Sequence, residues 1–256
     1  MFFYRRALYS SGCLDPISIM AKKQNLNLIL TQSDFDATIS ARNVIMPDYV
    51  AQENAILKVV AACPGFTLEE ILAKASIIND FYSTSVFDIL SVAKHFCSVL
   101  NATGLVDNKG NADYNVLMRM ANVTHGEKTI NHISFTSKFA RFVRPDLFPI
   151  FDGLVADTFC KLKSKGFFKV NTKFTKGLLM ADYNMYKAVY DEFMDLSGMK
   201  NLKRGTLKLT YKDVDDYLWT SRKVYLAKQG KNKSKVDLTT NEVDTVLNNI
   251  INTSIR

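Results

Sequence analysis

The stretch FTSKFARFVRPDLFPIFDGLVADTF, residues 135–159, decides the fold, because it holds two helical segments separated by a bend with two prolines. Proline disfavours helical backbone in the residue before it, so we predict that one helix ends near Arg144. A second helix is expected to begin at Asp152, whose side-chain oxygen can accept hydrogen bonds from free backbone N–H groups. The bend places Lys138, a lone lysine in a phenylalanine-rich helix, and Asp152 on adjacent helices, where a lysine and a carboxylate could act together. The alternative is a helix N-cap and a surface lysine.

Helical spacing of apolar residues recurs along most of the chain. One such segment starts at Pro47, and the next begins with a capping box of Thr67 and Glu70. Alternation with a period of two is confined to residues 167–174 and 206–211, so the predicted class is all-α. Further helices are expected at residues 83–100, 114–122, 134–143, 152–162, 176–198, 210–230 and near 241–252.

Length and composition are those of a globular protein. The 256 residues, 47% of them apolar and 23% charged, are enough for one large domain or two small ones. The net charge of +8 favours a polyanionic partner, and the alternative is a basic surface covered only by water. No apolar run approaches the roughly 20 residues of a membrane-spanning helix, so no membrane partner is expected.

The cysteines and the first residues bear on the compartment. We expect no cofactor and no metal, because no cysteine has a His or Cys neighbour at ligand spacing: Cys13, Cys63, Cys97 and Cys160. This usage favours a reducing compartment, and we expect a cytoplasmic protein in a bacterial nucleoid context. Residues 1–30 are expected to be an N-terminal extension, either a short disordered arm or an upstream-extended start before Met20. A targeting presequence is the alternative.

Two stretches, residues 161–176 and 222–235, are rich in lysine and arginine and contain no acid. Such cations suit phosphates, and the three phenylalanines of the first stretch could stack on bases. The alternative is a solvated surface with the aromatic rings turned inward. The expected phosphate ligands are Lys161, Lys163, Lys165, Lys169, Arg222 and Lys223.

Two segments in residues 134–155 resemble segments of a known family. SFTSKFA, residues 134–140, is similar to the turn and second helix of the helix–hairpin–helix motif in DNA glycosylases. That motif has a Gly-apolar-Gly turn followed by x-Lys-x-Ala, and Ser134 and Thr136 stand where the glycines would be. FPIFDGLV, residues 148–155, resembles the segment that ends in the family's catalytic aspartate, with Asp152 at that position.

Three further segments extend the resemblance in the same order. Residues 50–76 look like two consecutive helices of the endonuclease III superfamily, and residues 81–90 occupy the place of its next segment. KDVDDYLWT, residues 212–220, is similar to the closing Asp-x-x-Leu-Trp segment of small bacterial proteins that resemble 8-oxoguanine DNA glycosylase. The chain departs from the family in lacking the hairpin glycines, in a shorter Lys-to-Asp spacing and in lacking ligands for the iron–sulfur cluster of some members.

The resemblance implies an all-α fold of two helical lobes with a cleft between them, and a DNA glycosylase activity. Lys138 would be the nucleophile that attacks the sugar and forms a Schiff base, with lyase activity as a consequence. Asp152 would stabilise the positive sugar and move protons. An apolar setting would lower the pKa of the lysine, and the rings expected to provide it, as the wall of the cleft, are Phe135, Phe139 and Phe142.

Six residues are expected to contact DNA or an extruded base. Gln52 and Asn54 carry amides that can fill the hole left in the duplex, and the alternative is a helix N-terminus that faces water. Trp219 can stack on a base, and the alternative for this single tryptophan is a place in the core. By the resemblance, the remaining contacts come from the hairpin positions Ser134, Thr136 and Ser137.

The resemblance also implies lobe boundaries and a substrate. Residues 48–150 would form a six-helix-barrel-like lobe with the hairpin, and residues 31–47 plus 151–256 the second lobe. The substrate would be double-stranded DNA with a modified base, bound by a monomer; 8-oxoguanine repair is the default, and a hypermodified phage base excised in antiviral defence is the alternative. Two other functions stay open: a monofunctional glycosylase in which Asp152 activates water, and a helical DNA-binding module without catalysis.

Overall fold

The computed structural model describes residues 28–229, and in that range the all-α prediction is confirmed. The α-helices are α1 Gln32–Ile45, α2 Pro47–Ala62, α3 Leu68–Phe81, α4 Ile89–Thr103, α5 Tyr114–Ala121, α6 Ile133–Val143, α7 Gly153–Ser164, α8 Lys176–Ala181, α9 Tyr183–Leu196 and α10 Tyr211–Lys228. Two short antiparallel ribbons and one 3-10 turn complete the described elements: β1 Asn122–His125 with β2 Lys128–Asn131, β3 Lys203–Arg204 with β4 Leu207–Lys208, and η1 Met199–Asn201. Of the two alternating stretches, residues 206–211 contain β4, and residues 167–174 contain no strand.

Several sequence predictions lie outside the described residues. They concern most of the expected extension 1–30, the basic residues 230–235 and the helix near 241–252. Three residues at the end of the expected extension are described; Leu28 and Leu30 are buried, and Ile29 is exposed. The Leu30 N–H also donates to the Ser197 carbonyl at 2.9 Å, so the end of this segment packs into the core.

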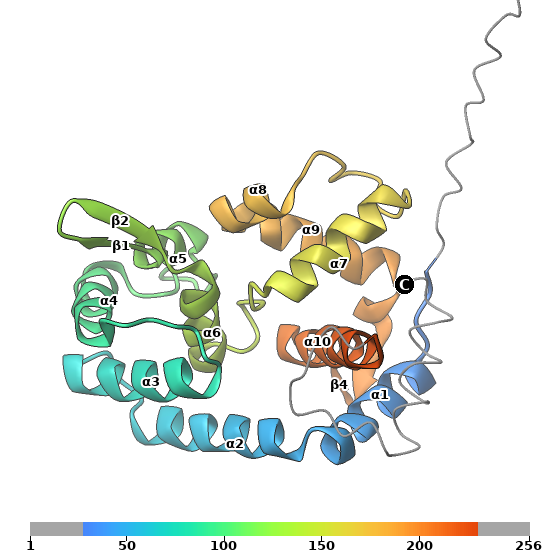
Figure 1. Cartoon of the computed structure of the whole chain (residues 1–256), viewed down its shortest axis with the longest axis horizontal. Coiled ribbons are helices and arrows are strands. Elements are labelled where there is room, and N and C mark those ends of the chain that lie inside the picture. The colour runs from blue at the N-terminus through green and yellow to red at the C-terminus, as the bar shows by residue number, and fades with distance from the viewer. Residues whose placement is uncertain (1–27, 230–256) are drawn as a thin grey trace, which may run out of the picture.

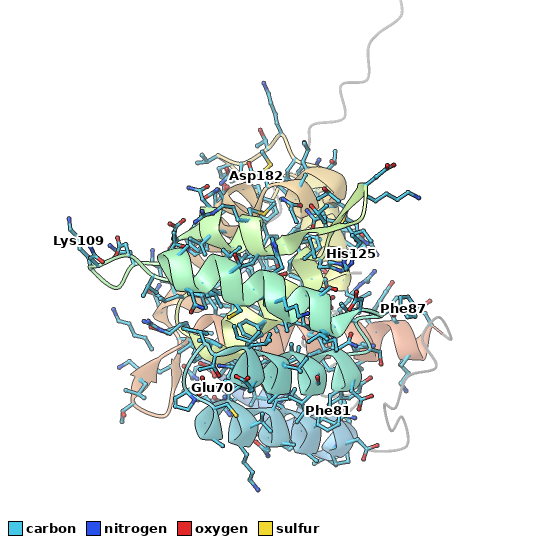
Figure 2. All side chains as sticks on the ribbon, turned by 90° about the vertical axis from the view of Figure 1, so that its left-hand side faces the viewer. Glu70, Phe81, Phe87, Lys109, His125 and Asp182 are labelled. Atoms are coloured by element: carbon cyan, nitrogen blue, oxygen red, sulfur yellow. The ribbon has the colours of Figure 1, made fainter. Side chains whose placement is uncertain are left out.

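The helices begin where side chains cap their free N–H groups. Thr67 Oγ1 accepts from the Glu70 N–H at 3.3 Å, and the Glu70 carboxylate accepts from the Thr67 N–H at 3.1 Å, so the predicted capping box is confirmed. Glu70, labelled in Figure 2, also accepts from the Gly65 N–H at 2.9 Å and so holds the preceding loop. Two further capping boxes start α1 and α10: Thr31 with Asp34, and Thr210 with Asp213.

The link between α5 and α6 differs from the sequence prediction. Ser134 and Thr136, expected in a hairpin turn, lie in the first turns of α6. The two helices are joined instead by the β1–β2 ribbon, in which Asn122 pairs with Asn131. The ribbon turns at Gly126, where φ of +60° favours glycine. The predicted turn at SFTSKFA is therefore wrong, because the segment lacks glycine and its backbone continues as helix.

Figure 1 shows two groups of helices. One group holds α2 to α6 and the β1–β2 ribbon; the other holds α7 to α10, with α1 lying against α10. The link from α6 to α7, residues 144–152, passes between the groups. Lys138 lies in α6, before the link, and Asp152 is the last residue of the link. That the groups are separate lobes stays a prediction. Within residues 28–229, no helix combines the length and the apolar character needed to cross a membrane.

Candidate active site

An open groove of about 550 Å³ lies beside the link between α6 and α7, and an inner cavity of about 40 Å³ adjoins it. The residues that line both are mostly aromatic, with one amine and one carboxylate among them: Tyr49, Phe81, Tyr82, Lys138, Asp152 and Trp219. Because these residues are shared, the groove leads into the inner cavity. Lys138 and Asp152, paired by sequence analysis, therefore meet in one site.

Lys138 projects into this site from α6. Its side chain is buried, and Nζ donates to the Ser134 carbonyl at 3.0 Å and to Ser134 Oγ at 2.7 Å, one helical turn away. Nζ also lies 5.6 Å from the centre of the Tyr82 ring. Burial lowers the pKa of the Lys138 amine, and the charges of Asp152 and Asp215 partly oppose this. The amine therefore loses its proton more readily than that of a lysine in water.

Asp152 stands at the start of α7. Its Oδ1 accepts from the Leu154 N–H at 2.7 Å, which confirms the predicted N-cap. The same carboxylate lines the groove and the inner cavity. Capping the helix and facing a ligand are thus compatible roles for this one side chain.

Asp215 is a second carboxylate at the inner cavity, supplied by α10. It accepts from the Ile150 N–H and from the Tyr190 hydroxyl, both at 2.8 Å. Burial raises its pKa to about 7, although the two hydrogen bonds act in the opposite direction. The cavity therefore holds a carboxyl group that changes charge near neutral pH.

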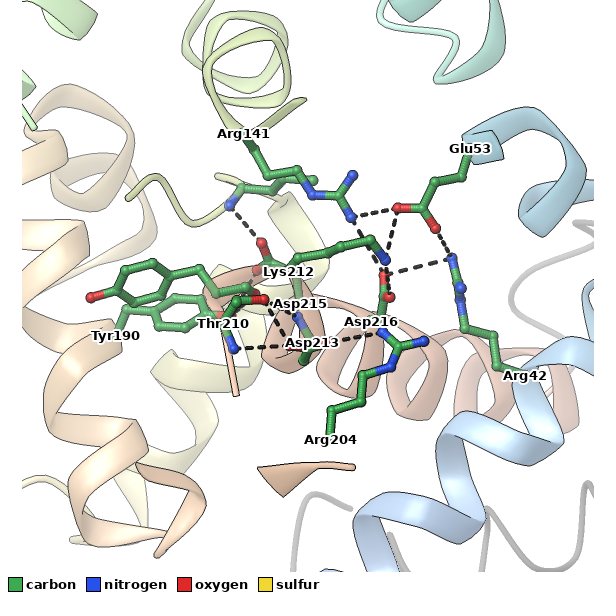
Figure 3. A network of polar contacts seen from close by, with 12 residues as sticks. Arg42, Glu53, Arg141, Tyr190, Arg204, Thr210, Lys212, Asp213, Asp215 and Asp216 are labelled. Atoms are coloured by element: carbon green, nitrogen blue, oxygen red, sulfur yellow. Dashed lines mark hydrogen bonds and ion pairs between the residues drawn. The ribbon is translucent and has the colours of Figure 1, made fainter. Parts of the chain in front are cut away.

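A buried network of charges closes the inner end of the site (Figure 3). Arg141 Nη2 lies 2.5 Å from Glu53 Oε1 and 3.6 Å from Asp216 Oδ1, and Arg42 Nη2 lies 2.9 and 3.5 Å from the same two carboxylates. Lys212 Nζ adds contacts of 3.2 Å to Glu53 and 2.7 Å to Asp216. Burial by itself raises the pKa of Glu53. The positive charges of Arg141, Lys212 and Arg42 together outweigh burial, so the pKa of Glu53 lies well below its usual range.

The predicted site residues include neither the members of this network nor Asp215, although Asp215 is the aspartate of the Asp-x-x-Leu-Trp segment. The sequence does contain a signal for these residues, namely a charged residue at an apolar position of a helix. Such a residue is costly to bury alone, so it indicates a buried partner of opposite charge. Arg141 lies between Ala140 and Phe142, and Glu53 lies on the buried side of α2 with Ile56. The pairing itself joins four separate helices, α1, α2, α6 and α10, and has no local pattern.

Three of the predicted DNA contacts lie away from the groove. Asn54 is exposed on α2 and does not line it. Thr136 and Ser137 are buried in α6, where Ser137 Oγ accepts from the Phe151 N–H at 2.9 Å. The prediction of DNA contact is wrong for these two, because α6 runs through the centre of the fold. Ser137 instead fixes the link that leads to Asp152.

The predicted walls of the cleft also differ. Phe135, Phe139 and Phe142 are buried in the core, where the first two pack on Phe96 with ring centres 5.7 and 5.2 Å apart. The groove is walled instead by the aromatic residues named above. Among them Trp219 meets Tyr49 edge-on at 4.8 Å. Trp219 thus packs against the core and faces the groove, and Gln52 lines the inner cavity.

The basic residues divide into two kinds. Arg222 is only 7% exposed, so the prediction of phosphate contact is wrong for it in this arrangement. Lys163 is half-buried and donates to the Phe174 carbonyl, and its contact with phosphate stays a prediction. Lys161 and Lys165 are half-buried and Lys169 is exposed. Lys223 lines the groove with Nζ 5.2 Å from the Trp219 ring. The three interleaved phenylalanines are turned inward: Phe167, Phe168 and Phe174.

Comparisons with known proteins give a family model and a distant relative. A model of the family HI_0787_N, described as an N-terminal domain, matches residues 32–147, which include Lys138 and end before Asp152. An uncharacterized protein of Haemophilus influenzae is 27% identical over 154 residues, 59% of this chain and 66% of that protein, so the chain spans just under two thirds of it. No solved structure matches the chain. Neither description names an activity, so the function is inferred from the site.

Proposed function

We propose that this chain is a DNA glycosylase that removes a modified base and uses Lys138 as its nucleophile. The observation that carries the proposal is the meeting of a buried amine with a lowered pKa and a carboxylate, Asp152, in one groove with aromatic walls. A glycosylase needs this combination, because it must hold a base outside the duplex and attack the sugar to which the base is attached.

In the proposed reaction, the extruded nucleotide enters the groove beside Lys138. Its neutral Nζ adds to the anomeric carbon while the bond from that carbon to the base breaks; the bonding electrons leave with the base, which takes up a proton. The amine then loses a proton, and the bond from the anomeric carbon to the ring oxygen breaks; the electron pair goes to that oxygen, which takes up a proton, and a Schiff base remains. Asp152 stabilises the positive charge that develops on the sugar and accepts the proton of the amine.

The groove supports this proposal through its size and its lining. Its volume of about 550 Å³ has room for a base and its sugar. Extruding a base costs about a few kcal/mol, and stacking on Tyr49, Tyr82 or Trp219 offsets part of that cost. Lys223 places positive charge at the same groove, where the phosphates of a bound strand would pass.

The test is trapping of a covalent adduct. The protein is incubated with duplexes that carry a panel of modified bases, 8-oxoguanine included, and with phage genomic DNA, in the presence of borohydride. We expect wild-type protein to become linked to a substrate DNA and Lys138→Gln to form no adduct. Lys176→Gln is the matched control, since Lys176 lines the same groove and its loss keeps the reacting amine, and this variant should still be trapped.

A monofunctional glycosylase is the second candidate, and one contact favours it. Lys138 Nζ already donates two hydrogen bonds to Ser134, which suits an ammonium group that stays protonated. Asp152 would then remove a proton from a water molecule that attacks the anomeric carbon. This reaction gives an abasic product without a trapped adduct. DNA binding with neither product would instead indicate a DNA-binding module without catalysis.

A further inference from the structure

The link between α6 and α7 is buried at its α7 end and lies there outside any helix or strand. Pro149, Ile150 and Phe151 are all buried, so their backbone polar groups need partners within the protein, and side chains supply them. The Pro149 carbonyl accepts from the Tyr183 hydroxyl. The N–H of the same peptide unit, at Ile150, donates to Asp215 at 2.8 Å, so this unit is held at both ends.

The next peptide unit is held at both ends as well. Its carbonyl, at Ile150, accepts from the Tyr186 hydroxyl at 2.5 Å, and its N–H, at Phe151, donates to Ser137 Oγ at 2.9 Å. Burial raises the pKa of Tyr186 well above the ordinary value for a tyrosine, so its hydroxyl keeps the proton that it donates. Turning either peptide unit breaks two hydrogen bonds, so the backbone that leads to Asp152 is fixed.

The contact between Ser137 and Phe151 joins the neighbours of the two groups that are proposed to react. Ser137 comes directly before Lys138 in α6, and Phe151 comes directly before Asp152. The Ser137 hydroxyl is fully buried and donates to the Ser134 carbonyl at 3.3 Å, which leaves its oxygen free to accept from the link. One hydrogen bond therefore ties the backbone beside the amine to the backbone beside the carboxylate.

Lys138 and Asp152 line the same groove without forming an ion pair. Within residues 28–229, the Lys138 amine donates to Ser134 and makes no ion pair with Asp152. The charge of Asp152 still raises the pKa of the amine and so opposes the effect of burial. A carboxylate that was free to approach would pair with the amine and hold its proton, and a protonated amine is no nucleophile.

We propose that Ser137 is a positioning residue that holds the Asp152 carboxylate in the groove but out of contact with the Lys138 amine. Tyr186 supports the same link from the opposite helix, α9. This inference rests on the proposed function and deepens it, because it names the contact that keeps the nucleophile able to lose its proton. Neither Ser137 nor Tyr186 touches the substrate, and both act through Asp152.

Titration of the Lys138 amine tests the inference without DNA. The pKa of the amine is measured by nitrogen NMR of isotope-labelled protein, and the Lys138→Gln variant identifies its signal. Ser137→Ala removes the acceptor of the Phe151 N–H, so Asp152 can approach the amine. We expect the pKa of Lys138 to rise by about 0.5 or more in this variant.

Two tyrosine variants complete this measurement. Tyr186→Phe removes the hydroxyl that holds the Ile150 carbonyl, so it should raise the pKa of Lys138 in the same direction. Tyr211→Phe is the matched control, because the hydroxyl that it removes donates to Asp191 and not to the link. This control should leave the pKa of Lys138 unchanged.

A double-mutant cycle with Asp152→Asn separates positioning from a general structural role. Without the charge of Asp152, Ser137→Ala should no longer change the pKa of Lys138. With that charge present, Ser137→Ala should lower the rate of adduct formation at neutral pH about threefold or more, because a smaller fraction of the amine is neutral. The affinity for DNA should change less than about twofold, since no group that contacts DNA is altered.

Two outcomes overturn the inference. One is a pKa of Lys138 that is unchanged or lower in Ser137→Ala, and the other is an equal effect of Ser137→Ala with and without the charge of Asp152. If Ser137→Ala fails to fold, Tyr186→Phe decides both points. The adduct and the abasic product judge the proposed function separately. Failure of both DNA assays together with the expected rise in pKa would refute the glycosylase and keep Ser137 as the residue that separates the amine from the carboxylate.

Discussion

The carboxylate of Asp215 accepts a hydrogen bond from the backbone N–H of Ile150 at 2.8 Å, across 65 residues of sequence. This contact joins α10 to the link that ends at Asp152. Tyr190 in α9 donates to the other oxygen of Asp215 at 2.8 Å, so three segments meet at one buried carboxyl group. Its protonation therefore bears on stability as well as on the inner cavity that Asp215 lines.

The free energy of unfolding is expected to fall as the pH rises through the range in which the protonation of Asp215 differs between the folded and the unfolded protein. The pKa of Asp215 is 3.8 when it is exposed in the unfolded chain and about 7 in the folded protein, because burial disfavours the charge. Between these two pH values the folded state holds a proton that the unfolded state has lost. The free energy of unfolding therefore decreases by up to about 4 kcal/mol by pH 7. Asp215→Asn should remove this slope, as measured by urea unfolding between pH 4 and pH 8.

Tyr190→Phe is the matched control for that measurement. It keeps the carboxyl group and removes one hydrogen bond that lowers the pKa of Asp215, so the decline should extend to higher pH. Equal pH slopes in wild-type protein and Asp215→Asn would show that Asp215 ionises normally.

The rate of adduct formation should rise with pH as Lys138 loses its proton. Burial lowers the pKa of Lys138 from 10.5, so the inflection should lie below that value. Asp215 opposes the shift when it is ionised, so Asp215→Asn should move the inflection to lower pH. Single-turnover rates measured from pH 6 to pH 11 check both shifts, and an inflection at or above 10.5 would rule out a buried amine as the nucleophile.

Gln52 is predicted to act on the substrate rather than on stability. It lines the inner cavity and is only partly buried, so Gln52→Ala should change the unfolding free energy by no more than about 0.5 kcal/mol. Excision should fall about tenfold, because an amide that contacts the base or its orphaned partner is lost. Asn54→Ala is the control on the same helix, since Asn54 is exposed and outside the groove. A large drop in melting temperature with unchanged excision would indicate a structural role for Gln52.

The basic stretch 161–176 is predicted to contact phosphates through Lys161, Lys165 and Lys169. Changing all three to glutamine should reduce the slope of log affinity against log salt by about 2 to 3, because each phosphate contact contributes about 0.9. A control with the same change of charge alters Lys58, Lys94 and Lys109, which are exposed on the α2–α5 side. Equal slopes in the two triple variants would remove this assignment.

Local patterns predicted the local structure of this chain well. Helical spacing and the Thr67–Glu70 capping box predicted α3, and the bend with two prolines predicted that α7 begins behind Asp152, its N-cap. The prediction of a hairpin turn at Ser134 was wrong, because it was taken from the place of the turn in the family motif and not from the residues of this segment. The segment has no glycine, and its own residues favour helix.

Contacts between distant segments could not be predicted in the same way. Glu53, Arg141 and Asp216 form one network, but they lie on three helices and no spacing in the sequence pairs them. Likewise, the phenylalanines beside Lys138 turn into the core, and the ring nearest its amine is that of Tyr82, from the end of α3. One sequence shows which residues are costly to bury, but not which partner makes their burial acceptable.

The last prediction concerns Asp152, which caps α7 and faces the groove with the same carboxylate. Asp152→Asn keeps an oxygen that can accept from the Leu154 N–H, so the melting temperature should change by less than about 3 °C. It removes the negative charge, so excision should fall at least about a hundredfold while DNA affinity is unchanged or slightly higher. Asp157→Asn is the matched control, an acid one turn further along α7 that lines the groove but not the inner cavity. If Asp152→Asn excised the base at nearly the wild-type rate, the carboxylate would serve only as a helix cap, and the proposed mechanism would be wrong.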